Sequence, residues 1–125
     1  AKSLHRLLAG YGSNITVCSR SAESAELSNF YGASHIYFPE LKKKNDFDIV
    51  INTVPHIVLT EAELKALKKS VIILDLASFP GGADTLMAAS LGLKIINGRG
   101  MPSKFTAKAA GEAIGCAADE IIRQL

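Results

Sequence analysis

The sequence predicts an α/β fold in which a parallel sheet carries helices on both faces. Segments typical of strands and helices alternate along the chain, and several of the strands are apolar along their whole length. Such strands suit a sheet that is covered on both sides. Small, polar or glycine-rich segments follow directly after the strands. The length of 125 residues corresponds to one domain.

The first part of the chain contains a helix, a strand and a second helix. Residues 1–9 place leucines at helical spacing, and Gly10 ends this segment. Residues 15–18 include β-branched side chains and predict a short strand. Ser21 is a suitable cap for the next helix, because its hydroxyl can accept from the first free backbone amides. We expect that helix to end near Gly32.

The middle of the chain predicts two strands and a capped helix. Residues 35–38 suit a strand that Pro39 should stop, since proline cannot donate a backbone hydrogen bond. Residues 47–52 are strongly apolar and predict a strand that is buried on both faces. Thr60 and Glu63 have the spacing of a capping box, in which each side chain bonds the other residue's backbone amide.

The last part of the chain continues the alternation. Residues 71–76 and 93–96 are apolar and predict two further strands. Between them, Asp84 is placed to cap a helix over residues 85–91. A long final helix is expected over residues 106–124.

Composition narrows the classes of partner. Hydrophobic residues make up 48% and charged residues 21%, with a net charge of +2, which is ordinary for a soluble protein and indicates neither a nucleic-acid nor a membrane partner. Cys18 and Cys116 have no CxxC or Cys/His metal spacing. We therefore expect reduced cysteines, a cytoplasmic location and no metal.

The candidate ligand site lies where the strands end. Ligands of open parallel sheets bind at the carboxyl ends of the strands. Any α/β protein also needs turns at those places, so one such segment alone does not indicate a ligand site, whereas several together favour one. The four segments that follow strands are 19–21, 53–55, 77–82 and 98–104.

A complete dinucleotide-binding motif is absent from the sequence. Gly10 and Gly12 form a lone GxG that follows a helix, whereas the fingerprint follows a strand. We interpret residues 1–125 as a truncated Rossmann-like domain, whose first strand and glycine-rich phosphate loop would lie before Ala1. We expect this piece alone to have no turnover and to bind a dinucleotide weakly or not at all.

The end of the strand expected at residues 15–18, which would be the second strand of a complete domain, favours NADP over NAD. NAD-binding units usually place an acidic residue there, whereas an arginine suits the 2′-phosphate of NADP. Here the strand ends in Ser19, Arg20 and Ser21, with no acidic residue. The alternative is that Arg20 is a surface residue and Ser21 only a helix cap.

Other residues near the strand ends are also candidates for the site or for a structural role. The segment Thr53, Val54 and Pro55 either packs against the cofactor or is only a tight turn. Asp75 lies within an apolar strand and needs a partner, so we expect it to bond backbone amides of a neighbouring loop. His56 lies near the expected cleft.

The other two histidines are scattered along the chain. His5 is expected to be exposed on the first helix, and His35 begins a strand. No catalytic grouping of serine, histidine and aspartate can be argued from spacing.

Two segments resemble a known family. Residues 75–82 (DLASFPGG) and 100–112 (GMPSKFTAKAAGE) closely resemble the C-terminal half of the family formed by the A subunits of dipicolinate synthase. Residues 16–21 and 49–55 resemble it as well. Two features depart from the family pattern: a serine at position 103, where glycine is common, and a missing proline before the final helix.

The resemblance implies a function and a set of site residues. It implies an N-terminal substrate domain, absent from this sequence, and an NADP-dependent oxidoreductase that forms dipicolinic acid during sporulation from a dihydrodipicolinate intermediate of the lysine pathway. A flavoprotein-like second subunit often works with it. The 2′-phosphate position falls on Arg20 and Ser21. The positions near the nicotinamide and substrate are Ala77, Ser78, Met101, Pro102 and Lys108.

Two lysines are candidates for binding a dicarboxylate substrate. Lys104 and Lys108 would attract it electrostatically, although both also suit a solvated helix surface. The catalytic acid or base and the oligomeric state, which includes a homo-oligomer, stay open. Two other functions are also open: the cofactor domain of a related two-domain dehydrogenase acting on 2-hydroxy acids or shikimate, and a non-catalytic nucleotide-binding domain.

Overall fold

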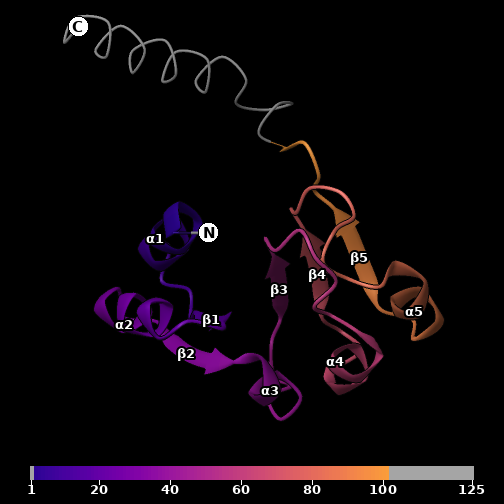
Figure 1. Cartoon of the computed structure of the whole chain (residues 1–125), viewed down its shortest axis with the longest axis horizontal. Helices are drawn as coiled ribbons and strands as arrows, with labels where there is room; N and C mark the ends of the chain where they lie inside the picture. The colour runs from indigo at the N-terminus through magenta and orange to yellow at the C-terminus, as the bar shows by residue number, and fades with distance from the viewer. Residues whose placement is uncertain (1, 102–125) are drawn as a thin grey trace, which may run out of the picture.

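The structure, a computed structural model, describes residues 2–101. Within them five strands and five helices alternate for most of the chain (Figure 1). The strands are β1 (Thr16–Ser19), β2 (Ser34–Tyr37), β3 (Ile49–Asn52), β4 (Ile72–Asp75) and β5 (Lys94–Asn97). The helices are α1 (Lys2–Gly10), α2 (Ala22–Phe30), α3 (Phe38–Leu41), α4 (Glu61–Ala66) and α5 (Thr85–Ser90). The helix predicted over residues 106–124 lies outside the described residues.

All strand pairs within the described residues are parallel, as the sequence predicts. They form two sheets, β1–β2 and β3–β4–β5, whereas the sequence predicted a single sheet. The register of the second sheet pairs Asn52 with Asp75, and Asp75 with Asn97. The carboxyl ends of its three strands therefore lie side by side at one edge, and the loops that follow them share that edge.

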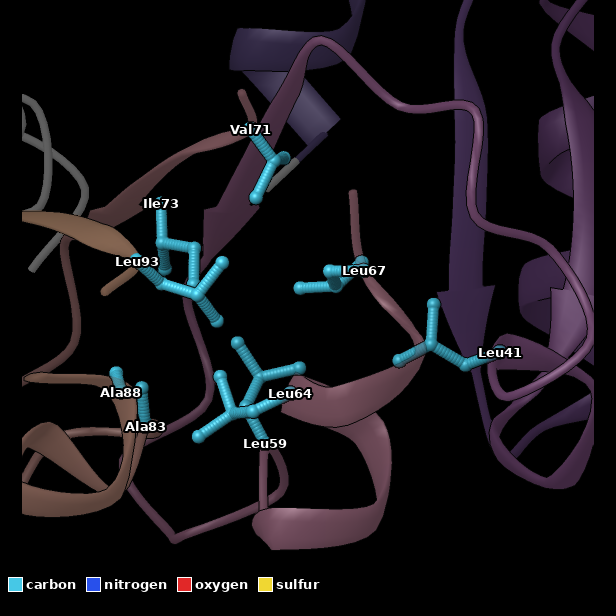
Figure 2. Packing of buried hydrophobic residues seen from close by; sticks show 9 residues of the cluster. All are labelled: Leu41, Leu59, Leu64, Leu67, Val71, Ile73, Ala83, Ala88 and Leu93. Carbon is cyan, nitrogen blue, oxygen red and sulfur yellow. The ribbon is translucent and has the colours of Figure 1, made fainter. Parts of the chain in front are cut away.

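The main apolar core lies between the β3–β5 sheet and the helices α4 and α5. Leu64 of α4 and Val71 and Ile73 at β4 are almost completely buried. Figure 2 shows these side chains gathered with leucines and alanines from α3, α5 and the loops. Burying each large aliphatic side chain contributes roughly 1.5–3 kcal/mol. This core fixes the position of the strand ends.

Three helix caps are confirmed. The Oγ of Ser21 accepts from the backbone N of Ser24 at 3.1 Å at the start of α2. At α5, the Oδ1 of Asp84 accepts from the backbone N of Met87 at 2.9 Å. At α4, the backbone N of Thr60 donates to the Oε2 of Glu63 at 3.0 Å, which belongs to the predicted capping box.

The structure corrects the prediction for Pro39. This residue does not simply stop a strand; it lies in the first turn of the short helix α3, after β2 has ended at Tyr37. Proline suits the first turn of a helix because the amide hydrogen it lacks has no partner there.

Two expectations about burial are wrong. His5 was expected to be exposed but is buried, with its ring edge-on to that of Tyr31 at 5.7 Å between centroids. Residues 47–52 were expected to be buried on both faces, yet Ile49 is 57% exposed. The open edge of β3 accounts for this exposure, because no strand covers that side within the described residues.

Within residues 2–101, no helix combines the length and the apolar character needed to cross a membrane.

Candidate functional site at the carboxyl ends of the strands

A buried polar network joins the ends of β3 and β4. Asn52 and Asp75 lie opposite each other at the last paired position, and the Nδ2 of Asn52 donates to the Oδ1 of Asp75 at 2.8 Å. The backbone N of Ala77 donates to the same Oδ1 at 3.1 Å, and that of Gly82 donates to Oδ2 at 2.9 Å. The expectation that Asp75 bonds backbone amides of a neighbouring loop is therefore confirmed.

The network keeps Asp75 ionised despite its burial. Burial raises the pKa of this carboxyl, while hydrogen bonds from Asn52, Gly82, Ala77 and Ala83 lower it by more. The net pKa therefore lies below the ordinary value for aspartate. A carboxylate held in this way supports the structure, because all of these donors stabilise the charged form.

Asn52 also shapes the turn that leaves β3. Its Nδ2 donates to the carbonyl of Val54 at 3.0 Å, and its Oδ1 accepts from the Val54 amide at 3.2 Å. Sequence reasoning missed this residue, because an asparagine at the end of an apolar strand is also typical of an ordinary turn. The sequence did contain one signal. Asn52 ends a strand that could pair with the strand of Asp75, and the carboxylate of Asp75 needs a hydrogen-bond donor.

Gly82 lets the loop after β4 approach this network closely. A Cβ built on Gly82 would lie 1.9 Å from the Nδ2 of Asn52, far inside any real contact. The amides of Val58 and Leu59, in the loop after β3, both donate to the Gly82 carbonyl at 2.9 Å. The loops after β3 and β4 thus form one unit.

The loop after β5 joins the same unit through Arg99. The Nη2 of Arg99 donates to the Pro80 carbonyl at 3.2 Å, and the guanidinium lies 5.7 Å from the ring centre of Phe79. Phe79 is 82% exposed, so this pair presents an aromatic face and a cation at the strand ends. Both residues lie in the segments 77–82 and 98–104 that the sequence places at the candidate site, although neither was singled out there as a site residue.

A cavity of about 410 Å³ lies between the loop after β1 and the loop after β3. Its cationic lining residues are Arg20 and Lys42, and His56 adds an imidazole. Its apolar lining residues are Phe38, Pro39, Val54, Ile57 and Val58, and Thr60 and Glu63 complete it. The structure therefore brings Arg20 and Val54, expected from the sequence to bind the cofactor, to one cavity.

The two cationic side chains that line this cavity differ in their partners. The Nζ of Lys42 lies 3.3 Å from the Oε1 of Glu63. Burial raises the pKa of Glu63, while hydrogen bonds from Thr60 and Lys42 lower it to a net value below the ordinary one. No ion pair is found for Arg20 among the described residues. Its guanidinium is the cation of this cavity best placed to meet an anion.

The predicted site residues around β1 have different surroundings. Ser21 is the cap of α2, and its Oγ also donates to the Oγ of Ser24 at 2.8 Å. The Oγ of Ser19 hydrogen-bonds the Nε2 of His35 at 2.9 Å. Arg20 stays exposed between them. The helix cap expected at Ser21 is therefore confirmed, and its contact with a cofactor stays a prediction.

The other predicted residues lie farther along the same edge. Ala77 is buried, and Thr53, Pro55, Ser78 and Met101 are exposed. Three predicted residues fall outside the described part of the chain, namely Pro102, Lys104 and Lys108. Within the described part, no group of three or more histidine, cysteine, aspartate or glutamate side chains could hold a metal.

Comparison with known proteins identifies a relative over nearly the whole chain. The A subunit of dipicolinate synthase from Bacillus subtilis (strain 168) is 31% identical over 124 residues, which are 98% of this chain and 42% of the relative. The chain is a homologue of that dipicolinate synthase protein. It spans about two fifths of the relative's length, and no family model matches it.

Solved structures agree with this relationship. The crystal structure of the A chain of dipicolinate synthase from Bacillus subtilis matches with a TM-score of 0.89 at 31% identity, over 98% of this chain and 41% of that one. The corresponding dipicolinate synthase structure from Bacillus halodurans matches with a TM-score of 0.87 at 27% identity, over 95% of this chain and 41% of the other. The sequence motifs and the arrangement of helices and strands therefore both make this chain similar to the A subunit of dipicolinate synthase.

Proposed function

We propose that this chain is the Rossmann-like cofactor domain of an NADP-dependent oxidoreductase of the dipicolinate synthase type. In this proposal the whole protein is cytoplasmic and forms dipicolinic acid from a dihydrodipicolinate intermediate during sporulation. The proposal includes a dicarboxylate substrate and a second type of subunit. It rests on the homology over 98% of the chain and on the cavity that contains Arg20.

The observation that carries the choice of cofactor is the position of Arg20. It stands directly after β1 and lines a cavity with Val54 and His56, and no acidic residue ends the strand. A carboxylate at that place would repel a phosphate, whereas a guanidinium offers donors that match one. The apolar residues of the cavity suit the flat face of an adenine.

The residues near the cavity would orient the cofactor and attract the substrate. NADP supplies the hydride acceptor when bound, and the chain's own residues orient it. Val54 lines the wall toward β3, while Ser78 and Arg99 stand at the ends of β4 and β5. Arg99, with Lys104 and Lys108, would attract the carboxylates of the substrate.

Calorimetric titration of the two cofactors tests the proposal. The protein used is a chimaera in which the residues that precede the matched segment of the Bacillus subtilis relative are joined to this chain. Arg20→Ala should weaken NADP binding about 10- to 100-fold, because a charge-assisted hydrogen bond is worth about 1.5–3 kcal/mol. NAD binding should change less than about twofold.

Arg99→Ala is the matched control, since it removes an exposed arginine from the loop after β5. It should leave the ratio of NADP to NAD affinity unchanged. An equal effect of Arg20→Ala on both cofactors would reject the 2′-phosphate assignment.

A further inference from the structure

The side chains of Ser19, His35 and Tyr37 form a polar cluster on one face of the β1–β2 sheet. The register pairs Ser19 with Tyr37, and residues two apart along a strand share a face, so His35 lies on the same face as both. The Oγ of Ser19 hydrogen-bonds the Nε2 of His35 at 2.9 Å. The rings of His35 and Tyr37 meet edge-on, with 4.9 Å between their centroids. We call these three residues the β1–β2 cluster.

The opposite face of the same sheet contributes to the apolar core. Cys18 and Ile36 pack against the buried leucines and alanines of that core. His35 is half-buried and takes no part in this packing. Its imidazole can therefore exchange protons with solvent without disturbing the core.

The β1–β2 cluster lies one residue away from the candidate cofactor cavity. Ser19 is the last residue of β1 and directly precedes Arg20, which lines that cavity. A phosphate bound to Arg20 at this strand end would have the Ser19 hydroxyl beside it. His35 would then lie behind Ser19, bonded to it through Nε2.

Protonation of His35 changes what Ser19 can offer to a ligand. A neutral imidazole can accept the Ser19 O–H at Nε2, which leaves only the lone pairs of Oγ for a ligand. An imidazolium can only donate, so the Ser19 O–H is then free to donate to a phosphate oxygen. The imidazolium also adds a positive charge at the end of β1. Histidine is the side chain that ordinarily changes its charge between pH 5 and 8.

We propose that His35 is a positioning residue for the 2′-phosphate of NADP, which acts through Ser19 and does so when it is protonated. NADP binding should therefore gain strength relative to NAD binding as the pH falls from about 8 to about 6. This inference rests on the proposed function, because it concerns the phosphate assigned to Arg20.

Acidic residues of the neighbouring helices do not bond His35. The helices α2 and α3 pack against both β1 and β2. Glu40 of α3 accepts from the backbone N of Tyr37 at 2.7 Å. Within residues 2–101, no hydrogen bond or ion pair joins His35 to any acidic residue of the two helices, namely Glu23, Glu26 and Glu40.

The cavity itself contains one competing group. Lys42 is paired with Glu63, and neither ordinarily changes its charge between pH 6 and 8. His56 also lines the cavity that contains Arg20. Its imidazole is therefore the alternative source of a pH-dependent charge there, and the experiment has to distinguish it from His35.

Calorimetric titration of NADP and NAD at several pH values tests the proposal in the chimaera described above. His35→Gln keeps an amide that can bond Ser19 but carries no charge. At about pH 6 the preference for NADP over NAD should be about 10-fold smaller in His35→Gln than in the unsubstituted chimaera, and at about pH 8 the two should differ less than about twofold. The 2′-phosphate itself gains a proton near about pH 6, but this affects both forms alike.

NMR titration of the His35 ring gives a second measurement, which does not require any substitution. By linkage, a proton that strengthens NADP binding about 10-fold is itself bound about 10-fold more tightly when NADP is present. The pH at which the His35 ring signals titrate should therefore rise by about one pH unit with saturating NADP, and much less with NAD.

Three outcomes would decide against parts of this argument. An equal pH dependence with and without His35→Gln, or ring signals that NADP does not shift along the pH axis, would overturn the proposal. A pH dependence that disappears in His56→Gln and persists in His35→Gln would assign the proton to His56 and overturn it as well. If Arg20→Ala fails to discriminate between the cofactors, the proposed function is rejected instead; if it does discriminate while His35→Gln has no effect on the pH profile, only this inference fails.

Discussion

Replacing Gly82 with alanine is a direct test of the polar network at the ends of β3 and β4. The added Cβ would lie 1.9 Å from the Nδ2 and 2.4 Å from the Cγ of Asn52, so the amide group has to move. Gly82 does not have a positive φ, and alanine can therefore adopt its backbone conformation. The steric conflict with Asn52 is the main expected consequence.

The cost can be estimated from the bonds that Asn52 would lose. Its hydrogen bond to the charged Asp75 is worth about 1.5–3 kcal/mol, and each of its two bonds to the Val54 backbone about 1 kcal/mol. Replacing glycine by alanine returns about 0.4–1 kcal/mol through the unfolded state. We expect Gly82→Ala to lower the free energy of unfolding by about 3 kcal/mol, and the Tm by about 10 °C.

Urea denaturation followed by far-UV circular dichroism measures this loss. Gly10→Ala is the matched control, since a Cβ there meets nothing within 4 Å and Gly10 has no positive φ. In an Asn52→Ala background the conflict disappears, so Gly82→Ala should then cost less than about 0.5 kcal/mol. A loss for Gly82→Ala that matches the Gly10 control, or that persists fully without Asn52, would refute the reasoning.

Three further predictions concern single polar groups. Asp84→Ala removes the bond to the Met87 amide at the start of α5 and should cost about 1 kcal/mol in urea denaturation. The pKa of Asp75 is lower in the folded state than in the unfolded state, so ionised Asp75 stabilises the fold fully above about pH 4 and less as the pH falls below that. In urea denaturation at different pH values, Asp75→Asn should therefore flatten the loss of stability toward acid pH. Burial, with a smaller effect of Glu40, raises the pKa of Cys18 to about 11, so its alkylation in a Cys116→Ser background should accelerate about 10-fold per pH unit from pH 8 to 10.

Local chemistry made the caps and the alternation of elements predictable. The side chains of Ser21 and Asp84 bond amides three residues away, so their spacing in the sequence already contains the geometry. The same is true of Thr60 and Glu63. The expected strands also lie where the apolar runs are, although each is shorter or shifted by a residue or two.

Features that depend on distant contacts were not predictable. The partner of Asp75 is Asn52, 23 residues away, and only the pairing of β3 with β4 brings them together. His5 is buried because α1 lies against the end of α2, where its ring meets Tyr31. Pro39 is compatible with a strand end and with a helix start, and the sequence does not decide between them.

The polar network and the candidate cofactor cavity share one turn. Asn52 holds both the amide and the carbonyl of Val54, and Val54 lines the cavity together with Arg20. A substitution that displaces Asn52 therefore releases a wall of that cavity without touching Arg20. For this reason Gly82→Ala should weaken NADP and NAD binding by the same factor in the chimaera. Arg20→Ala should instead weaken NADP binding much more than NAD binding. The two variants together therefore distinguish the contribution of the cavity's shape to binding from that of its charge.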